Sequence, residues 1–436
     1  IRERRLSPLK LTQRLLAGID QLDGSLTAYI TVCHERAVQE AADRTAELDD
    51  GDYRGPLHGI PIAHKDLIAT RGVRTTYHTD HFKDYVPSFD APVVERLRKA
   101  GTVLLGKANT LELGSGDGPV FGLARNPWDP ERQVGGSSSG SAVAVAAGLA
   151  VAATGSDAGG SIRIPASFCG IVGLKPTAGL VYMGEGKNGI SVTGPMTRTV
   201  TDCAVLLEAM AGIDGLIEQV TGDVRGLTVG VPVDWVDTPL EDDIAEGFHA
   251  SLDTLRSSGA KLIDVRLPHA EASETLGALI THVDCFGKYR FLLDARAKLS
   301  PFFHELLLAT ELYTASDYMA AQRMRRLMIS DVVYAHAQVD VMVTPTVPFR
   351  TARLDQMEFV VAGRVVNART GQGRFTRLSN LTGYPSLSVP VGLDSNGMPL
   401  SVQLHGRPFE EGTLLRTARA LELANSQRAA RPRIHI

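Results

Sequence analysis

The beginning of the chain carries apolar and charged positions at helical spacing. Within residues 8–50 the apolar side chains recur every three or four positions, and the pattern ends at the turn sequence DDGDYRG. This period is typical of amphipathic helices, which bury one face and expose the other. We therefore predict two amphipathic helices in this stretch, packed on a larger body.

The pattern changes over residues 56–205. Short apolar segments such as GIPIAHKDL and GTVLLGK are separated by loops rich in glycine, serine and proline, which is typical of strands joined by tight turns. An alanine-rich stretch at 141–153 predicts a buried helix. Glycine allows a backbone to turn sharply or to approach a ligand, so we expect the functional centre in this part of the chain.

Strands and helices alternate over the second half of the chain. Residues 226–234 and 260–268 are predicted as strands on either side of a helix, and residues 270–340 as several helices. The remaining predicted elements are strands at 339–345, 386–393 and 399–404 and a last helix at 411–424. This alternation predicts an α/β fold with a central sheet covered by helices on both faces.

The chain shows no internal repeat, low-complexity segment or convincing linker. We therefore predict a single domain over residues 1–436, because large α/β folds often form one unit. Within it, residues 56–205 and 340–410 are expected to form the sheet of the catalytic core. Residues 226–338 are expected to form a more variable helical region that shapes the substrate pocket.

Composition narrows the classes of partner. Of the 436 residues, 44% are hydrophobic and 22% charged, and the formal net charge is −4. A chain without a basic surplus is not drawn to phosphate backbones or anionic lipid, so we expect neither nucleic acid nor a membrane surface as a partner. The longest apolar run, residues 142–153, is shorter than the roughly 20 residues that a membrane span needs.

The cysteines and the start of the chain bear on the cellular compartment. The four cysteines lie far apart and form no metal-finger spacing: Cys33, Cys169, Cys203 and Cys285. This distribution favours neither a structural zinc nor a disulfide framework and fits a reducing, cytoplasmic setting. The residues after Ile1 lack the apolar core of a signal peptide, and we interpret the start as trimmed rather than as a targeting segment.

A glycine-rich segment at 155–163, GSDAGGSIR, joins small residues to one serine. Consecutive backbone N–H groups of Ala158, Gly159 and Gly160 can converge on one point, which would form an oxyanion hole beside the hydroxyl of Ser161. Taken alone, the segment is also compatible with an ordinary glycine turn.

Two upstream segments supply the other groups that acyl transfer needs. The loop 135–141, GGSSSGS, leads into the alanine-rich stretch, and its serines could simply cap that helix. Lys65 ends a short apolar strand, where a lone lysine is usually solvated. A serine hydroxyl is a weak nucleophile without a base, and lysine serves as a base only if burial keeps it neutral. Together, the three segments predict one complete acyl-transfer site.

These segments resemble the amidase signature family, whose hallmark reads roughly GGSSGGS followed by GTDxGGSIRxPA. This chain has GGSSSGS at 135–141 and GSDAGGSIRIPA at 155–166. Agreement extends over nearly the whole chain, including PLHGIPIAHKDL, NPWDP, GPMTRTVTD, NLTGYPSLSVPVG and PLSVQLHGRPF. The resemblance implies the fold of that family, a large mixed sheet between two layers of helices. Homodimers are common among its members.

The resemblance also implies a role for individual residues. Ser161 would attack the carbonyl, Ser137 would relay the proton and Lys65 would accept it, with a cis peptide bond between Gly136 and Ser137. The oxyanion hole would comprise the backbone N–H groups of Ala158, Gly159, Gly160 and Ser161. No metal, nucleotide or organic cofactor is required. Departures from the family pattern at Ser139, Ser156 and Ala158 keep the residues small, so they bear on substrate preference more than on catalysis.

Three rival sites are weaker. The segment 101–107, GTVLLGK, lacks the serine or threonine that follows the lysine of a phosphate-binding loop, because Ala108 stands there. The segment 136–140 matches GxSxG around Ser138, but no strand is predicted before it, as a hydrolase elbow requires. His78 and His81 could bind a metal, although their surroundings are more typical of a surface loop or a pocket wall.

The substrate is the least determined feature. We expect an amide of a small molecule; the alternatives are a carbamate (urethane) or ester, or the side chain of glutamine if the chain is the glutaminase subunit of a tRNA amidotransferase complex. A non-catalytic binding protein with the same fold is a further alternative, disfavoured because all three catalytic positions are filled. Expected pocket residues are Gly114, Ser115, Gly116, Asp117 and Tyr182, within the wider segments 77–81, 114–117, 182–189 and 286–303.

Overall fold

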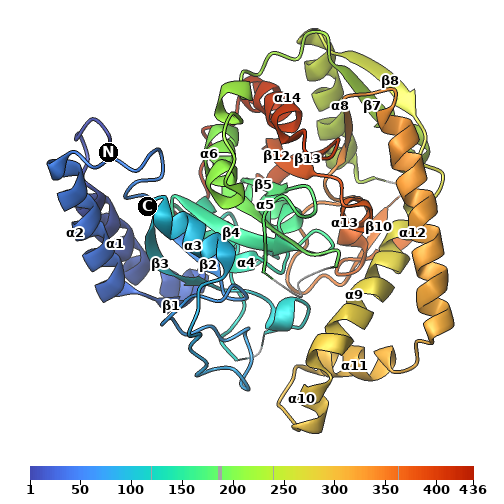
Figure 1. Cartoon of the computed structure of the whole chain (residues 1–436). Helices are drawn as coiled ribbons and strands as arrows, with labels where there is room; N and C mark the ends of the chain where they lie inside the picture. Colours follow the sequence, from blue (N-terminus) through green and yellow to red (C-terminus); the bar gives the residue numbers. More distant parts are fainter. Residues whose placement is uncertain (119, 185–188, 239, 362) are drawn as a thin grey trace.

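The structure is a computed structural model that describes residues 1–118, 120–184, 189–238, 240–361 and 363–436. In these residues, eleven strands form one mixed sheet in the order β1-β3-β2-β4-β6-β5-β12-β13-β9-β7-β8. Helices pack on both faces of this sheet (Figure 1). The predicted α/β fold with a large covered mixed sheet is therefore confirmed.

The strands of the large sheet are mostly short. Their bounds are Tyr29–Val32 (β1), Pro61–Lys65 (β2), Val103–Ala108 (β3), Ala152–Asp157 (β4), Val172–Lys175 (β5), Val192–Thr197 (β6), Thr228–Pro232 (β7), Lys261–Val265 (β8), Val341–Pro345 (β9), Ser386–Leu393 (β12) and Pro399–Gly406 (β13). A separate antiparallel hairpin joins β10 and β11, which span Glu358–Val361 and Arg364–Asn367.

The α-helices fall into three groups along the chain. The first contains Pro8–Leu26 (α1), His34–Asp50 (α2), Pro92–Lys99 (α3), Ser139–Ala146 (α4), Arg163–Cys169 (α5) and Val200–Ala211 (α6). The second contains Val233–Val236 (α7), Asp242–Ser257 (α8), Ser273–Tyr289 (α9), Phe291–Asp294 (α10), Pro301–Thr310 (α11) and Ala315–His336 (α12). The last contains Arg377–Thr382 (α13) and Glu411–Ala424 (α14). Figure 1 places α9–α12 on the side of the molecule opposite α1 and α2.

Side-chain alternation along the strands divides the core between the two faces. Ile62 and Ala152 belong to one hydrophobic cluster, together with residues of α3, α6, α8 and α14. Their neighbours Ala63 and Ala153 belong to another, with residues of α1, α2, α4 and α5. Because successive residues of a strand point to opposite faces, the two-residue period of the buried strands produces both layers.

The parallel strands β2, β3 and β4 bring two polar segments, Lys65 and the glycine-rich loop, to the same edge of the sheet. His64 pairs with Lys107 of β3 and with Thr154 of β4, and β2 ends one residue later at Lys65. Strand β4 ends at Asp157, directly before the glycine-rich loop. Parallel strands end at the same edge of a sheet, so Lys65 and this loop meet there.

The observed elements depart from the predicted ones at three places. The two N-terminal helices are separated by a strand, β1, which pairs antiparallel with β3. The helix predicted at 141–153 ends at Ala146, and Ala152 already belongs to β4. Both elements are buried, so the alanine-rich sequence carries no polar position that would mark the boundary. The hairpin β10–β11 was not predicted. The strands β12 and β13 and the helix α14 lie where predicted.

Within the described part of the chain, every helix is too short or too polar to cross a bilayer.

Candidate active site

Lys65 ends strand β2 with its side chain completely buried. Its Nζ donates hydrogen bonds to the Oγ of Ser137 at 2.8 Å and to the Oγ of Ser156 at 2.9 Å, with the Ser156 carbonyl at 3.3 Å. Lys65 forms no ion pair with any residue that the structure describes. The lysine is therefore surrounded by hydroxyl and carbonyl oxygens rather than by a carboxylate in direct contact.

This environment favours the neutral form of Lys65. Burial lowers its pKa from the ordinary value of 10.5 to about 7, and the more distant carboxylate of Asp157 opposes the shift only in part. Desolvation penalises a charged amine because water no longer stabilises the ammonium. Near neutral pH, a substantial fraction of Lys65 can therefore accept a proton, as a general base must.

Ser137 lies in the loop before α4, and the peptide bond between Gly136 and Ser137 is cis. The Ser137 carbonyl accepts hydrogen bonds from the Oγ1 of Thr110 at 2.9 Å and from the N–H of Leu111 at 3.2 Å. These contacts hold the backbone while the hydroxyl faces Lys65. The sequence-predicted pair of Lys65 and Ser137 is thus in direct contact.

Ser161 follows Gly160, whose φ of +122° is unfavourable for residues with a side chain. The Ser161 carbonyl accepts a hydrogen bond from the N–H of Ser138 at 3.1 Å, which ties the two serine loops together. Ser161 is half-buried. Among the described contacts there is no hydrogen bond between the side chains of Ser137 and Ser161, so the third predicted residue is joined to the site through backbone contacts.

In the glycine-rich loop, one of the four predicted oxyanion donors already has a hydrogen-bond partner. The Gly160 N–H donates to the Oδ1 of Asp157 at 2.7 Å and is therefore occupied. The N–H groups of Ala158, Gly159 and Ser161 have no hydrogen-bond partner among the residues that the structure describes. Three of the four predicted donors remain available, because the fourth fixes the loop to its own strand end.

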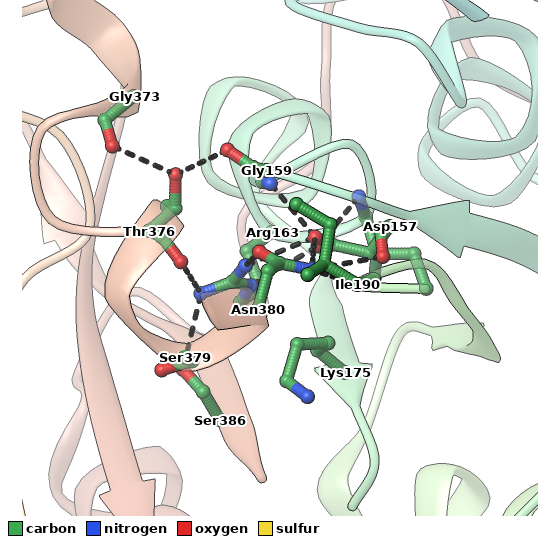
Figure 2. A network of polar contacts seen from close by, with 12 residues as sticks. Asp157, Gly159, Arg163, Lys175, Ile190, Gly373, Thr376, Ser379, Asn380 and Ser386 are labelled. Carbon is green, nitrogen blue, oxygen red and sulfur yellow. Dashed lines mark hydrogen bonds and ion pairs between the residues drawn. The ribbon is translucent and has the colours of Figure 1, made fainter. Parts of the chain in front are cut away.

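A buried ion pair between Arg163 and Asp157 stabilises the glycine-rich loop (Figure 2). The Nε and Nη2 of Arg163 donate to the two carboxylate oxygens of Asp157 at 3.0 and 2.9 Å, and both side chains are fully buried. Burial alone would raise the pKa of the Asp157 carboxyl, but the Arg163 guanidinium and the N–H groups of Ile162 and Gly160 hold it well below its usual range. Asp157 is therefore a fixed negative charge that orients the loop.

Residues near α13 complete the support from a distant part of the chain. The Oγ1 of Thr376 donates to the Gly159 carbonyl at 2.7 Å, and the Nδ2 of Asn380 donates to the Asp157 carbonyl at 2.9 Å. Arg163 in turn donates to the Thr376 carbonyl at 2.7 Å. Figure 2 shows Thr376 beside Gly159 and Asn380 between Thr376 and Asp157. The peptide between Gly159 and Gly160 is thus fixed through its carbonyl by Thr376 and through its N–H by Asp157.

Several of these supporting residues were missed in the sequence. Asp157 and Arg163 carried a local signal, since they are the charged residues that flank an otherwise small segment. Thr376 and Asn380 are more than 200 positions from their partners, and no local pattern indicates the contact. Ser156, which contacts Lys65, stood out only as a departure from the family pattern.

A cavity of about 560 Å³ lies next to this edge of the sheet. It is lined by Tyr77, Phe82, Tyr85, Met183, Gly189, Ser191, Asp284, Lys288 and Tyr289. Two contacts connect it to the candidate active site. The Tyr77 carbonyl accepts from the N–H of Leu113, next to Gly114, and Val192 pairs with Asp157 directly after Ser191. Aromatic rings form one wall, and α9 contributes polar side chains to the other.

Some of the segments predicted to form the pocket line this cavity, and others do not. Segments 77–81 and 286–303 contribute Tyr77, Lys288 and Tyr289, and segment 182–189 contributes Met183 and Gly189; residues 185–188 lie outside the described residues. Tyr182 is half exposed and is not among the residues that line this cavity, so its role in binding substrate stays a prediction.

The segment 114–117 does not line the cavity either. A Cβ at Gly114 would lie 3.7 Å from the Oγ of Ser137, which places Gly114 beside the Ser137 hydroxyl. Ser115 lies beside Cys285 of α9, Gly116 lies against Glu112, and Asp117 forms an ion pair with Arg369. Only Gly114 of these four therefore faces the candidate active site.

The rival sites are occupied by structural contacts. Lys107 is fully buried and donates to the Ile68 carbonyl and the Oγ1 of Thr75, each at 2.6 Å, so it is not available to phosphate. The Oγ of Ser138 lies 3.3 Å from both the carbonyl and the N–H of Ser156, and among the described residues no strand leads directly into Ser138. The Nδ1 of His78 contacts the Asn109 side chain at 2.9 Å. Nowhere in the described part of the chain do three or more potential ligands cluster to hold a metal.

Comparison with known proteins shows the family of this chain. The family model described as Amidase matches residues 10–415. A glutamyl-tRNA(Gln) amidotransferase subunit of Geobacter metallireducens is 36% identical over 98% of this chain and 96% of its own length.

Solved structures give the same relationship. A crystal structure of an amidase superposes with a TM-score of 0.89 at 32% identity, covering 97% of both chains. The corresponding glutamyl-tRNA(Gln) amidotransferase subunit of Thermotoga maritima has a TM-score of 0.79 at 33% identity, covering 97% of this chain and 95% of that one. The chain therefore belongs to the amidase signature family.

Proposed function

We propose that this protein hydrolyses the C–N bond of a small-molecule amide through an acyl-enzyme formed on Ser161. The observation that carries the proposal is the hydrogen bond from the buried Lys65 to Ser137, since the lysine's pKa of about 7 lets it accept a proton. A base of this kind is what a serine hydroxyl needs to become a nucleophile.

The proposed cycle moves one proton along the two serines. Neutral Lys65 takes the proton of Ser137 as Ser137 takes that of Ser161, and the Ser161 Oγ adds to the carbonyl carbon. The same path then returns the proton to the leaving nitrogen as the C–N bond breaks. Water next gives a proton to the relay and adds to the acyl carbon, which releases the carboxylic acid and restores Ser161.

The N–H groups of Ala158, Gly159 and Ser161 are the proposed oxyanion donors. Their support is that they lack partners among the described residues, while Asp157 and Thr376 fix the intervening peptide. A fixed donor stabilises the charge that develops in the transition state without reorganisation, and one such donor contributes about 10²- to 10³-fold in rate.

The cavity supports a small substrate. A volume of about 560 Å³ lies within the range of small-molecule sites, and its aromatic wall suits the apolar part of a substrate. The same nucleophile would accept a carbamate or an ester, so these substrates remain alternatives within the proposal.

A second candidate function is that of a glutaminase subunit. It is favoured by the relatives named as glutamyl-tRNA(Gln) amidotransferase subunits, which match almost the full chain at 34–36% identity. In that case the partner would be another protein, and the isolated chain would be weakly active and selective for glutamine. A screen of purified protein against glutamine, aryl amides, carbamates and esters distinguishes the two functions.

The nucleophile is tested by labelling with a fluorophosphonate, followed by mass mapping of the adduct. We expect an adduct on Ser161 that is lost in Lys65→Ala and retained in Ser138→Ala, the matched control in the neighbouring loop. An adduct on Ser138 that survives the lysine change would contradict the assignment. No adduct in the folded protein would favour a partner-dependent enzyme or a non-catalytic protein.

A further inference from the structure

The guanidinium of Arg377 lies beside the loop that carries Ser161. Arg377 is the first residue of α13. A Cβ placed on Gly159 would be 3.0 Å from its Nη1, which shows how closely the two approach. The flanking residues Thr376 and Asn380 are hydrogen-bonded to Gly159 and Asp157. The backbone that carries Arg377 is therefore fixed relative to the candidate oxyanion donors.

Three glycines make room for this side chain. Besides Gly159, a Cβ on Gly277 of α9 would lie 3.1 Å from the Cδ of Arg377, and one on Gly373 would lie 3.0 Å from its Nε. Gly277 is two helical turns from Asp284, which lines the cavity, so both lie on the same face of α9. Arg377 therefore lies along the α9 face that extends to the cavity.

Arg377 has no counter-charge in contact. Its guanidinium makes no hydrogen bond or ion pair with any residue that the structure describes, and its Nε is buried without a partner. Burial lowers the pKa of Arg377, and the carboxylates of Glu274 and Asp157 oppose the shift without contacting it. Arg163, which is fully buried beside the same loop, shows the contrast, since each of its side-chain nitrogens has a partner.

We propose that Arg377 binds a carboxylate of the substrate, a short distance from the scissile carbonyl. Guanidinium groups bind carboxylates through two parallel hydrogen bonds, and such pairs are strong where water is excluded. Because Gly159 contributes an N–H to the proposed oxyanion hole and also borders Arg377, a carbonyl and a carboxylate joined by a short linker can reach both. This inference rests on the proposed function and defines its substrate class as anionic amides.

The experiment compares two isosteric amides. Succinamate carries a carboxylate, whereas 4-oxopentanamide carries a neutral acetyl group of similar shape, and ammonia release measures kcat/KM for both. We expect the protein to prefer succinamate, and Arg377→Met to reduce the ratio of the two kcat/KM values by about ten- to a hundredfold. Arg377→Lys keeps the positive charge but loses the planar guanidinium that forms two parallel hydrogen bonds, so it should give an intermediate ratio.

Arg374→Met is the matched control, because Arg374 lies on the same segment but pairs with Glu271 at 3.8 Å. It should leave the ratio unchanged. N-acetyl-β-alanine, compared with its neutral methyl-ketone isostere, tests a carboxylate on the amine side of the bond instead of the acyl side. A ratio near one for both pairs, or an equal loss on both members of a pair in Arg377→Met, would overturn the inference.

A binding measurement separates this inference from the proposed function. Calorimetric titration with succinate needs no turnover, and we expect binding to the unaltered protein and to Arg374→Met but not to Arg377→Met. If no amide is hydrolysed while succinate binding still depends on Arg377, the proposed function fails and the anion site stands. If amides are hydrolysed but succinate binds equally well to Arg377→Met, the anion site fails and the function stands.

Discussion

Three charged side chains beside the Ser161 loop are buried and paired, whereas several charged side chains of the helices α9–α12 pair with each other at the surface. Lys65, Asp157 and Arg163 have no solvent-accessible surface, and each has partners from more than one segment. In the helical region, Lys288 and Asp284 pair with each other at the surface, and Leu312 of the α11–α12 connection is 80% exposed.

This difference means that the two regions tolerate substitution to different extents. A buried charge is tolerated only where its partners have fixed positions, so the candidate active site admits few changes. Exposed side chains contribute little to folding and are free to vary. The cavity lies between the two regions, and its helical wall is therefore where substrate preference can change without loss of the fold.

The sharpest test of this contrast is Lys65→Ala. Because it removes the proposed base, kcat/KM should fall by about 10²- to 10⁴-fold. Lys288→Ala, the matched change in the cavity wall, should alter kcat/KM far less. Steady-state kinetics of both variants measure the difference, and equal losses would show that the two regions are not distinct in function.

The ion pair beneath the loop should dominate stability. Arg163→Met leaves Asp157 buried without its counter-charge, and the free energy of unfolding should fall by about 3–5 kcal/mol. Arg290→Met breaks an exposed pair with Asp294 and should cost less than about 1 kcal/mol. Denaturant unfolding of both variants measures these values, and a small effect of Arg163→Met would mean that the loop is held by other contacts.

The pH dependence should report the buried lysine. Its protonated form is inactive as a base, so kcat/KM should rise about tenfold per pH unit below pH 7 and level off above the pKa of about 7. The residual activity of Lys65→Ala should lack this rise. A profile that is unchanged in the variant would assign the titration to another group.

The smallest effect is expected in the cavity wall. Met183→Ala enlarges the cavity at a half-buried position, so it should shift the kcat/KM ratio of bulky to small acyl amides by about tenfold or less. The free energy of unfolding should change by about 1 kcal/mol or less. A large loss of stability would contradict the prediction, because it would show that this wall is needed for folding.

Local sequence patterns predicted some elements of the fold better than others. The β12 and β13 strands and α14 have polar or turn residues at their ends, and they lie where predicted. The boundary between α4 and β4 was misplaced, because buried helix and buried strand are both continuously apolar. The strand β1 has four residues and gains its hydrogen bonds from β3, so its own sequence carries little signal.

The sequence by itself determined the family, the sheet covered by helices and the candidates Lys65, Ser137 and Ser161. These features depend on the alternation of residues within a strand and on short motifs, and both involve only residues that are close together in the sequence. Only the tertiary structure decided which N–H groups of the loop are available, that Thr376 and Asn380 hold it, and that Arg377 lies beside it. These contacts join segments about 220 positions apart. They depend on how the strands are ordered in the sheet, which no local pattern records.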